Sequence, residues 1–353
     1  MRNSNIELLR IVAMLFIVAH HMVYNSGLSE CFDYAQPTVG LIWLQWLGGW
    51  GKTAINAFVV ITGYFMCESA LSMRRLSKLI VPVVFWQIAI YLAFLAFGRE
   101  VVSFMRLFEL VGYYFRGINN GFTVSFIWFY LGIPFYNIIV KNSTRNQLYA
   151  LIGLLLLHFT FSATCFASKY SFNHSFWYMT VYFIGAAIRK YPLAWMADNK
   201  KCTAWLFACI GLASLWMLGN DVLMWKGVGN NFQYWLISDS DKPLALAIGI
   251  LAFLVFRNMN IGYSKVLNAI ASTTFGVLLI HANSDAMRQW LWHDLLNVPS
   301  WYSMKHIMLI CISIIAATGV FVACSAFEYL RINVFNMLWG VTRGKNNESR
   351  GEI

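Results

Sequence analysis

Charged side chains are scarce in this chain: only 12% of its 353 residues are Asp, Glu, Lys or Arg, whereas 59% are hydrophobic. An ordinary soluble domain carries about 25% charged residues. So few charged side chains cannot cover a surface that faces water. Lipid must therefore solvate much of the surface of this protein. The composition therefore excludes a soluble globular protein and predicts a polytopic membrane protein.

The sequence also lacks the spacings that mark metal and disulfide sites. None of the seven cysteines belongs to a CxxC pair, and most of them lie within apolar runs. This pattern argues against a zinc knuckle and against a disulfide framework. No HExxH motif is present, and the histidines show no ligand spacing. We therefore expect core thiols and no metal.

A long basic stripe is missing as well. The net charge is +11, but the basic residues form short clusters between apolar segments. Proteins that bind nucleic acid usually gather their positive charge on one face or in one tail. We therefore expect membrane lipids, and no nucleic acid, among the partners of this protein.

Ten apolar segments have the composition of membrane-spanning helices. A span needs about 20 apolar residues, and a bundle accommodates shorter ones. The first segment is longer than the core of a signal peptide and has no small-residue cleavage site, so we expect it to remain uncleaved. The sequence predicts an all-α polytopic membrane bundle of about ten transmembrane helices, near 6–24, 52–67, 79–97, 126–140, 147–165, 174–188, 202–219, 243–256, 266–282 and 306–328.

The distribution of basic residues predicts how this bundle is oriented. With the N-terminus inside, the inner segments carry most of the Lys and Arg residues, including the cluster Arg189, Lys190, Lys200 and Lys201. Cytoplasmic segments of membrane proteins show such an excess. We therefore expect both termini to be cytoplasmic. The span at 52–67 is the weakest of the ten because its apolar core is short. If this segment does not cross the membrane, the number of spans is odd and the two termini lie on opposite sides.

Arg10 and His21 are the most informative residues of the first span. They lie eleven residues apart in an otherwise apolar stretch. Eleven helical steps return to within roughly 20° of the same direction and advance about 16 Å, so Arg10, Met14, Ile17 and His21 form one stripe. Ionisable side chains inside the hydrocarbon usually face a bundle interior or a wet cavity. The stripe indicates a site; the alternative is a snorkelling arginine and a packed, hydrogen-bonded histidine.

His281 lies at a similar depth in another outward-running span. Each of the two histidines follows the inner end of its predicted helix by about fifteen residues, which places both roughly 22 Å up, beyond the midplane. Two imidazoles at similar depth can meet in one cavity, where one acts as general base and the other as orienter or as a donor to the substrate. The alternative for His281 is a helix-end residue at the headgroup level.

A basic loop follows the second predicted span. Arg74, Arg75 and Lys78 are three cations within five residues, on the inner side of the membrane. The forked arginine side chain suits phosphate oxygens, so this loop is suited to anchoring a phosphate-bearing donor from the cytoplasm. A long thioester carrier held there and at Arg10 would thread its reactive end upward. The alternative is charge that only sets topology.

Several short motifs follow one another along the chain. They are Ile6-Glu7-Leu8-Leu9-Arg10 leading to His21, Gly51 to Phe58 leading to Ile61-Thr62-Gly63-Tyr64-Phe65, Arg75 with Lys78 and Pro82, Ile127-Trp128-Phe129-Tyr130 with Pro134, and Thr274 to His281. In this order they closely resemble the acyltransferase-3 family of integral membrane acyltransferases, over nearly the whole chain. Three positions depart from the usual residues of that family, since Glu7 stands for Asp, Thr62 for Ser and Lys78 for Arg.

The resemblance implies a domain organisation and an activity. Residues 1–330 would form one acyltransferase-3 transmembrane domain, and residues 331–353 a basic cytoplasmic tail. The protein would be a multi-pass O-acetyltransferase of a bacterial plasma (inner) membrane. It would move an acetyl group from cytoplasmic acetyl-CoA to a hydroxyl of a cell-surface or lipid-linked saccharide.

The resemblance also implies roles for particular residues. His21 would be the catalytic residue, either as the base that deprotonates the acceptor or as the carrier of the acetyl group, with Arg10 and His281 beside it. The CoA phosphates would be held by Arg10, Arg74, Arg75 and Lys78. The Lys78 ammonium is a point charge, whereas an arginine guanidinium can bind two phosphate oxygens at once. This difference affects how selectively the donor is bound.

An outer segment is a candidate for contact with the saccharide. Trp225, Tyr234 and Trp235 lie there among amide and carboxylate side chains. Aromatic faces suit sugar rings, and amides both donate and accept hydrogen bonds with sugar hydroxyls. The same composition also describes an ordinary interfacial loop.

Two other functions remain open. One is a transporter or exporter of a small polar solute, with Arg10 and His21 lining its path. Transporters often carry inverted repeats and helices broken in matching halves, and no such repeat stands out in this sequence. The other is a non-catalytic assembly partner of glycan-modifying enzymes, for which replacing His21 would leave function intact.

Overall fold

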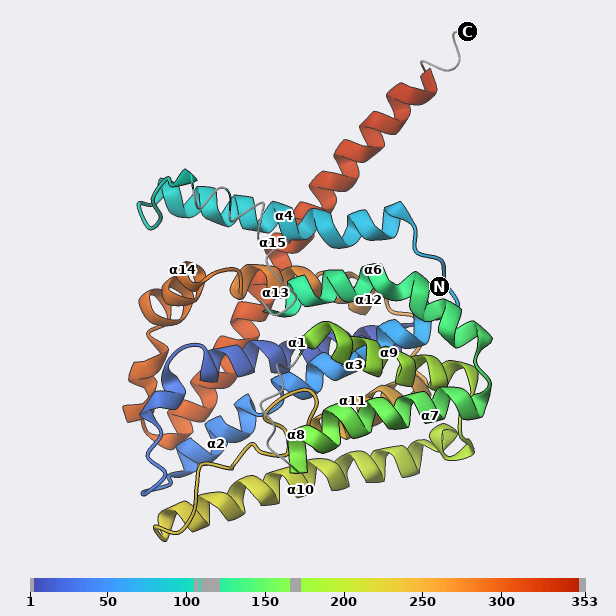
Figure 1. The fold of residues 1–353 in the computed structure, drawn as a ribbon. Helices are drawn as coiled ribbons and strands as arrows, with labels where there is room; N and C mark the ends of the chain where they lie inside the picture. The colour runs from blue at the N-terminus through green and yellow to red at the C-terminus, as the bar shows by residue number, and fades with distance from the viewer. Residues whose placement is uncertain (1–2, 105–107, 109–120, 166–172, 349–353) are drawn as a thin grey trace.

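The structure is a computed structural model that describes residues 3–104, 108, 121–165 and 173–348 (Figure 1). Within these residues the chain is helical and contains no β-strand. The all-α fold predicted from the sequence is therefore confirmed.

Each of the ten predicted segments contains helix. The helices are α1 (Ser4–Tyr24), α3 (Gly51–Met66), α4 (Met73–Ala96), α6 (Gly121–Asn142), α7 (Arg145–Leu156) continuing through the π-helical turn η2 (Leu157–Phe161) into α8 (Ser162–Cys165), α9 (His174–Lys190), α10 (Asn199–Trp225), α11 (Pro243–Asn258), α12 (Lys265–Ala271) followed by α13 (Thr274–His281), and α15 (His306–Glu348).

Polar side chains fix where several of these helices begin. The side chain of Asn3 accepts a hydrogen bond from the backbone N–H of Asn5 at the start of α1. Thr144 and Gln147 form a reciprocal capping box at the start of α7. Asp198 caps α10 in the same way as Asn3 caps α1. Such caps satisfy backbone donors that the first helical turn leaves unpaired.

Six helices among the described residues are long and apolar enough to cross a membrane, or up to seven if the bent pair spanning 265–303 counts as one span. These helices make the chain a multi-pass membrane protein. The other predicted spans are short, since α3 has 16 residues and α9 has 17. A helix of that length reaches about 24 Å, less than the roughly 30 Å of a bilayer core. The count of ten and the cytoplasmic termini therefore stay predictions.

Helix α1 lies at the centre of the bundle. It packs against α2 (Val39–Gly48), α3, α11, α12, α13 and α15. Figure 1 shows α4 along one side of the bundle and α10 along the opposite side, with α1 and α3 between them. A helix with neighbours on several faces can place polar side chains away from lipid, which is where charged groups inside a membrane are tolerated.

Two glycines let α3 and α9 approach each other closely. A Cβ atom on Gly63 would lie 2.4 Å from the backbone oxygen of Tyr182, and one on Gly185 would lie 2.5 Å from the backbone oxygen of Val60. Small residues at helix contacts are the usual way in which membrane helices pack backbone against backbone. This contact holds two short helices in the interior of the bundle.

The chain turns back on itself after α13. The helical segments Lys265–His281 and Asp285–Ser303 meet at 97°. The second segment consists of α14 (Asp285–Arg288), the π-helical η4 (Gln289–Leu295) and the 3-10 helix η5 (Val298–Ser303). The bend follows His281, the last residue of α13. The His281 side chain is fully buried, so α13 ends inside the protein.

The last helix continues past the predicted domain boundary. Helix α15 runs from His306 to Glu348 without a break, and its C-terminal part stands away from the bundle (Figure 1). The division at residue 330 falls inside this helix and stays a prediction. The end of the predicted tail, 349–353, lies outside the described residues.

Candidate active site

Two histidines from distant parts of the chain meet at one point. His21 lies in the last turn of α1, and His281 ends α13. The Nδ1 atom of His21 is 2.9 Å from the Nε2 atom of His281. The Nδ1 atom of His281 is 2.6 Å from the backbone oxygen of Val277. The structure thus links the two rings and ties the second ring to the backbone of its own helix.

This chain of hydrogen bonds determines where the protons lie when both rings are neutral. A carbonyl oxygen can only accept, so Nδ1 of His281 must carry the proton and donate it to Val277. The Nε2 atom of His281 is then an acceptor, and Nδ1 of His21 must donate to it. The Nε2 atom of His21 is therefore left with a free lone pair, which is the state needed for a general base or a nucleophile.

His21 also lines a cavity of 330 Å³ between α1, α3, α4, α6, α12 and α13. The stripe predicted from the sequence forms one wall of this cavity, since Arg10, Met14, Ile17 and His21 all line it. Arg75 and Lys78 of α4 line it as well. Residues that are far apart in the sequence thus place one imidazole and three cations on the same cavity.

The cavity is electropositive. None of the described residues that line it is Asp or Glu. Arg10 pairs with the buried carboxylate of Glu7 at 3.4 Å, and about a third of the Arg10 side chain remains exposed. Arg75 donates a hydrogen bond of 2.9 Å to the backbone oxygen of Ala70, which holds its guanidinium in place. A cavity lined by one sign of charge attracts an anionic ligand.

Arg74 is separate from this group. Its side chain is exposed and does not line the cavity, although it is adjacent to Arg75 in the sequence. Successive residues of a helix point about 100° apart, so one of the two cations faces the cavity and the other faces away from it.

Sequence reasoning missed an aromatic wall on α6. Phe122, Phe126 and Tyr130 line the cavity at spacings of four residues. The rings of Phe122 and Phe126 stack with centroids 5.5 Å apart, and those of Phe126 and Tyr130 with centroids 6.1 Å apart. The spacing of four residues places the three rings on one helix face, and this pattern in the sequence could have predicted the wall.

The three residues expected to contact a saccharide have different surroundings in the structure. Trp225 is exposed at the end of α10. The ring of Trp235 packs on Trp216 with centroids 5.6 Å apart. The ring of Tyr234 instead meets Tyr24 edge to face with centroids 5.4 Å apart. None of the three lines the cavity that contains His21.

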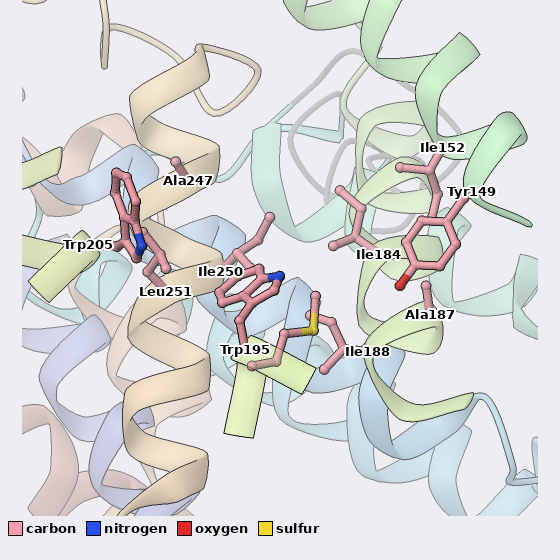
Figure 2. Close-up of a pocket in the computed structure, with 11 residues that line it drawn as sticks. Tyr149, Ile152, Ile184, Ala187, Ile188, Trp195, Trp205, Ala247, Ile250 and Leu251 are labelled. Atoms are coloured by element: carbon pink, nitrogen blue, oxygen red, sulfur yellow. The ribbon is translucent and has the colours of Figure 1, made fainter. Parts of the chain in front are cut away.

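A second cavity, of 560 Å³, lies between α7, α9, α10 and α11. Figure 2 shows that its wall is formed by aliphatic and aromatic side chains, including Trp195, Trp205 and Tyr149. Among the described residues that line it there is no histidine, carboxylate or cation. General acid-base chemistry needs a titratable group in reach, so the cavity beside His21 is the better candidate.

No three His, Cys, Asp or Glu side chains of the described residues gather in a way that could hold a metal ion. The absence of a metal stays a prediction from the sequence. The cation and imidazole groups of the His21 cavity suit a phosphate-bearing substrate and a proton transfer.

Comparison with known proteins identifies the family of the chain. The family model described as an acyltransferase domain, acyltransferase-3, matches residues 3–327. No curated protein and no solved structure matches the chain. The matched region contains His21, His281 and every cation of the cavity. The family model covers the bundle from α1 into α15, and the chain therefore belongs to the acyltransferase-3 family.

Proposed function

We propose that this membrane acyltransferase moves an acetyl group from cytoplasmic acetyl-CoA to a hydroxyl of a cell-surface or lipid-linked saccharide. In this proposal the Arg75 end of the His21 cavity opens to the cytoplasm of a bacterial cell. The opposite end of α1, beyond His21, faces the outside. The membrane would then separate the two substrates, with His21 between them.

One observation carries the proposal: the cavity that contains His21 also contains Arg10, Arg75 and Lys78. Arg10 and His21 are eleven residues apart on one helix, which corresponds to about 16 Å along the axis. This separation suits a donor whose charged end and reactive end are far apart. The CoA phosphates would bind the three cations, and the thioester would reach His21.

The free lone pair of His21 supports direct transfer. The Nε2 atom takes the proton of the acceptor hydroxyl while the hydroxyl oxygen attacks the thioester carbonyl carbon. The carbon–sulfur bond then breaks, and the CoA sulfur takes the proton from the imidazolium. The products are an acetyl ester and the CoA thiol. His281 acts as a positioning residue, because its hydrogen bond keeps the proton of His21 on Nδ1.

A two-step reaction uses the same atom. Nε2 would attack the thioester first and release CoA, and the acceptor hydroxyl would then attack the acetylated imidazole. Incubation with acetyl-CoA in the absence of acceptor distinguishes the two reactions. Direct transfer leaves the protein unmodified, whereas the two-step reaction leaves one acetyl group on His21, which mass spectrometry of the intact protein detects.

The proposed function predicts a change in the surface glycan of the cell. Deleting the gene should remove one acetyl group from each repeat of one glycan, and the intact gene on a plasmid should restore it. Mass spectrometry of the purified glycans measures both effects. Surface glycans with the same acetyl content in the presence and absence of the protein would reject the saccharide acceptor.

A further inference from the structure

The apolar cavity between α7, α9, α10 and α11 reaches the surface of the bundle. It has a volume of 560 Å³, and Figure 2 shows Trp205 on one side of its wall, Tyr149 on the other and Trp195 between them. Trp195 belongs to η3 (Ala194–Ala197), a 3-10 helix between α9 and α10. The side chains of Trp195 and Trp205 are both exposed, so this wall extends to the outside of the protein.

The wall suits a hydrocarbon ligand. The described residues that line the cavity are isoleucine, leucine, alanine, methionine, tryptophan and tyrosine. The hydroxyl of Tyr149 is already used, because it donates a hydrogen bond of 2.9 Å to the backbone oxygen of Tyr191. An apolar cavity does not hold ordered water, and an empty one forfeits the dispersion contacts that a ligand would supply. A hydrocarbon chain is therefore the occupant that matches this wall.

Two exposed cations lie one helical turn beyond the wall. Arg145 precedes Tyr149 by four residues on α7, and Lys201 precedes Trp205 by four residues on α10. Residues four apart share one face of a helix. The Cζ atom of Arg145 is 5.9 Å from the centroid of the Tyr149 ring. Each cation thus continues the face that lines the cavity.

A third cation lies at the same end. Arg257, in the last turn of α11, donates a hydrogen bond of 2.6 Å to the backbone oxygen of Met196, which also lines the cavity. Asp198 brings a carboxylate to this end and forms an ion pair of 3.5 Å with Lys201. Arg145, Lys201 and Arg257 outnumber this carboxylate, so the end of the cavity carries a net positive charge that attracts an anion.

This positive end lies on the same side of the bundle as Arg75. Arg189 follows Ile188, a residue of the wall, and donates a hydrogen bond of 3.0 Å to Glu68 in the segment that joins α3 to α4. In that segment the backbone oxygen of Ala70 accepts from Arg75. An excess of cations marks the cytoplasmic side of a membrane protein. The lipid headgroups of the cytoplasmic leaflet give it a negative surface potential.

We propose that this cavity binds an acyl chain of an anionic phospholipid whose phosphate lies among Arg145, Lys201 and Arg257. The apolar wall takes the chain, and charge-assisted hydrogen bonds hold the phosphate. The exposed indoles of Trp195 and Trp205 then lie at the level of the headgroups, where tryptophan is enriched. A zwitterionic phospholipid offers the same chain without net negative charge and binds more weakly. The site is separate from the His21 cavity and does not require acetyl transfer.

Two variants test the chain and the headgroup separately. Ala247→Phe fills the cavity, because Ala247 lines it, and its control is Ala208→Phe at an exposed position of α10 that does not line the cavity. Arg145→Gln combined with Lys201→Gln removes two exposed charges. Its control is Lys226→Gln, since Lys226 is exposed at the other end of α10. The probes are phosphatidylglycerol and phosphatidylcholine with identical acyl chains, and oleate.

The full chain is purified, stripped of lipid in detergent and titrated with each probe. Native mass spectrometry counts the bound molecules, and the thermal unfolding midpoint is followed in parallel. We expect the wild type to bind phosphatidylglycerol about tenfold more tightly than phosphatidylcholine. Phosphatidylglycerol should also raise its midpoint, because a ligand of the folded state stabilises that state.

The variants should lose different parts of this binding. Ala247→Phe should weaken the binding of both phospholipids, by about tenfold, because the chain loses its apolar contacts. The double glutamine variant should bind the two phospholipids equally. Both controls should behave like the wild type.

The contrary results are equally clear. Equal affinity of the wild type for the two phospholipids overturns the proposed site, as does unchanged binding of phosphatidylglycerol in Ala247→Phe. Oleate that displaces phosphatidylglycerol at equal concentration assigns the cavity to a free fatty acid and also overturns it. If Ala247→Phe does not fold, the double glutamine variant decides: loss of the preference for phosphatidylglycerol supports the site, and a retained preference overturns it.

Discussion

Replacing His21 with Gln is expected to lower the rate of acetyl transfer by about 10²- to 10⁴-fold, the range that a general base usually contributes. The glutamine side chain retains an N–H group that can donate to His281, which now receives a hydrogen bond from His21. It has no lone pair basic enough to take a proton from an alcohol. The chemical step is therefore lost while the contact between α1 and α13 is kept.

The measurement is transfer of labelled acetyl from acetyl-CoA to the purified glycan, with the unfolding midpoint followed in parallel. His158→Gln is the control, because His158 lies in η2 and does not line the His21 cavity. We expect a midpoint near that of the wild type for both variants. A His21→Gln protein that still acetylates the glycan would rule out the assigned role and favour an assembly partner.

Replacing Arg75 and Lys78 together with Ala is expected to raise the KM for acetyl-CoA by about 10- to 100-fold, since hydrogen bonds between charged groups contribute roughly 1.5–3 kcal/mol each and exposure reduces that value. Both side chains are exposed at the cavity. They would bind phosphates rather than the reacting atoms, so kcat should change much less than KM. Steady-state kinetics with varied acetyl-CoA measures both constants.

Two comparisons sharpen this experiment. Arg74→Ala should raise KM by a smaller factor, because its side chain does not line the cavity. Salt should raise the KM of the wild type more than that of the double variant, because ions screen exposed charges. If the double variant and the wild type show the same KM and the same dependence on salt, the cations do not anchor the donor.

The positions of helices could be predicted from the sequence because apolar length is a local property. The structure has helix in every predicted segment, and the stripe from Arg10 to His21 follows from helical periodicity alone. The break between α12 and α13 was not predicted, although it lies at the polar residues Ser272 and Thr273 inside the predicted span 266–282. The short helix α3 is held by close packing against α9. A contact between two segments that are far apart in the sequence cannot be predicted from a local pattern.

The meeting of His21 with His281 followed from equal distances to the helix starts, and the structure brings the rings together. The direction of their hydrogen bonds could not be predicted, since it depends on the backbone of Val277. The aromatic wall of α6 also escaped prediction.

We propose that the cavity lined by His21, Arg10, Arg75 and Lys78 holds the acyl donor. Electron cryomicroscopy of the protein with bound CoA tests it most directly. We expect CoA phosphates at Arg75 and Lys78, with the sulfur beside Nε2 of His21. Density for CoA elsewhere, such as in the apolar cavity of Figure 2, with the His21 cavity free of ligand, would contradict it.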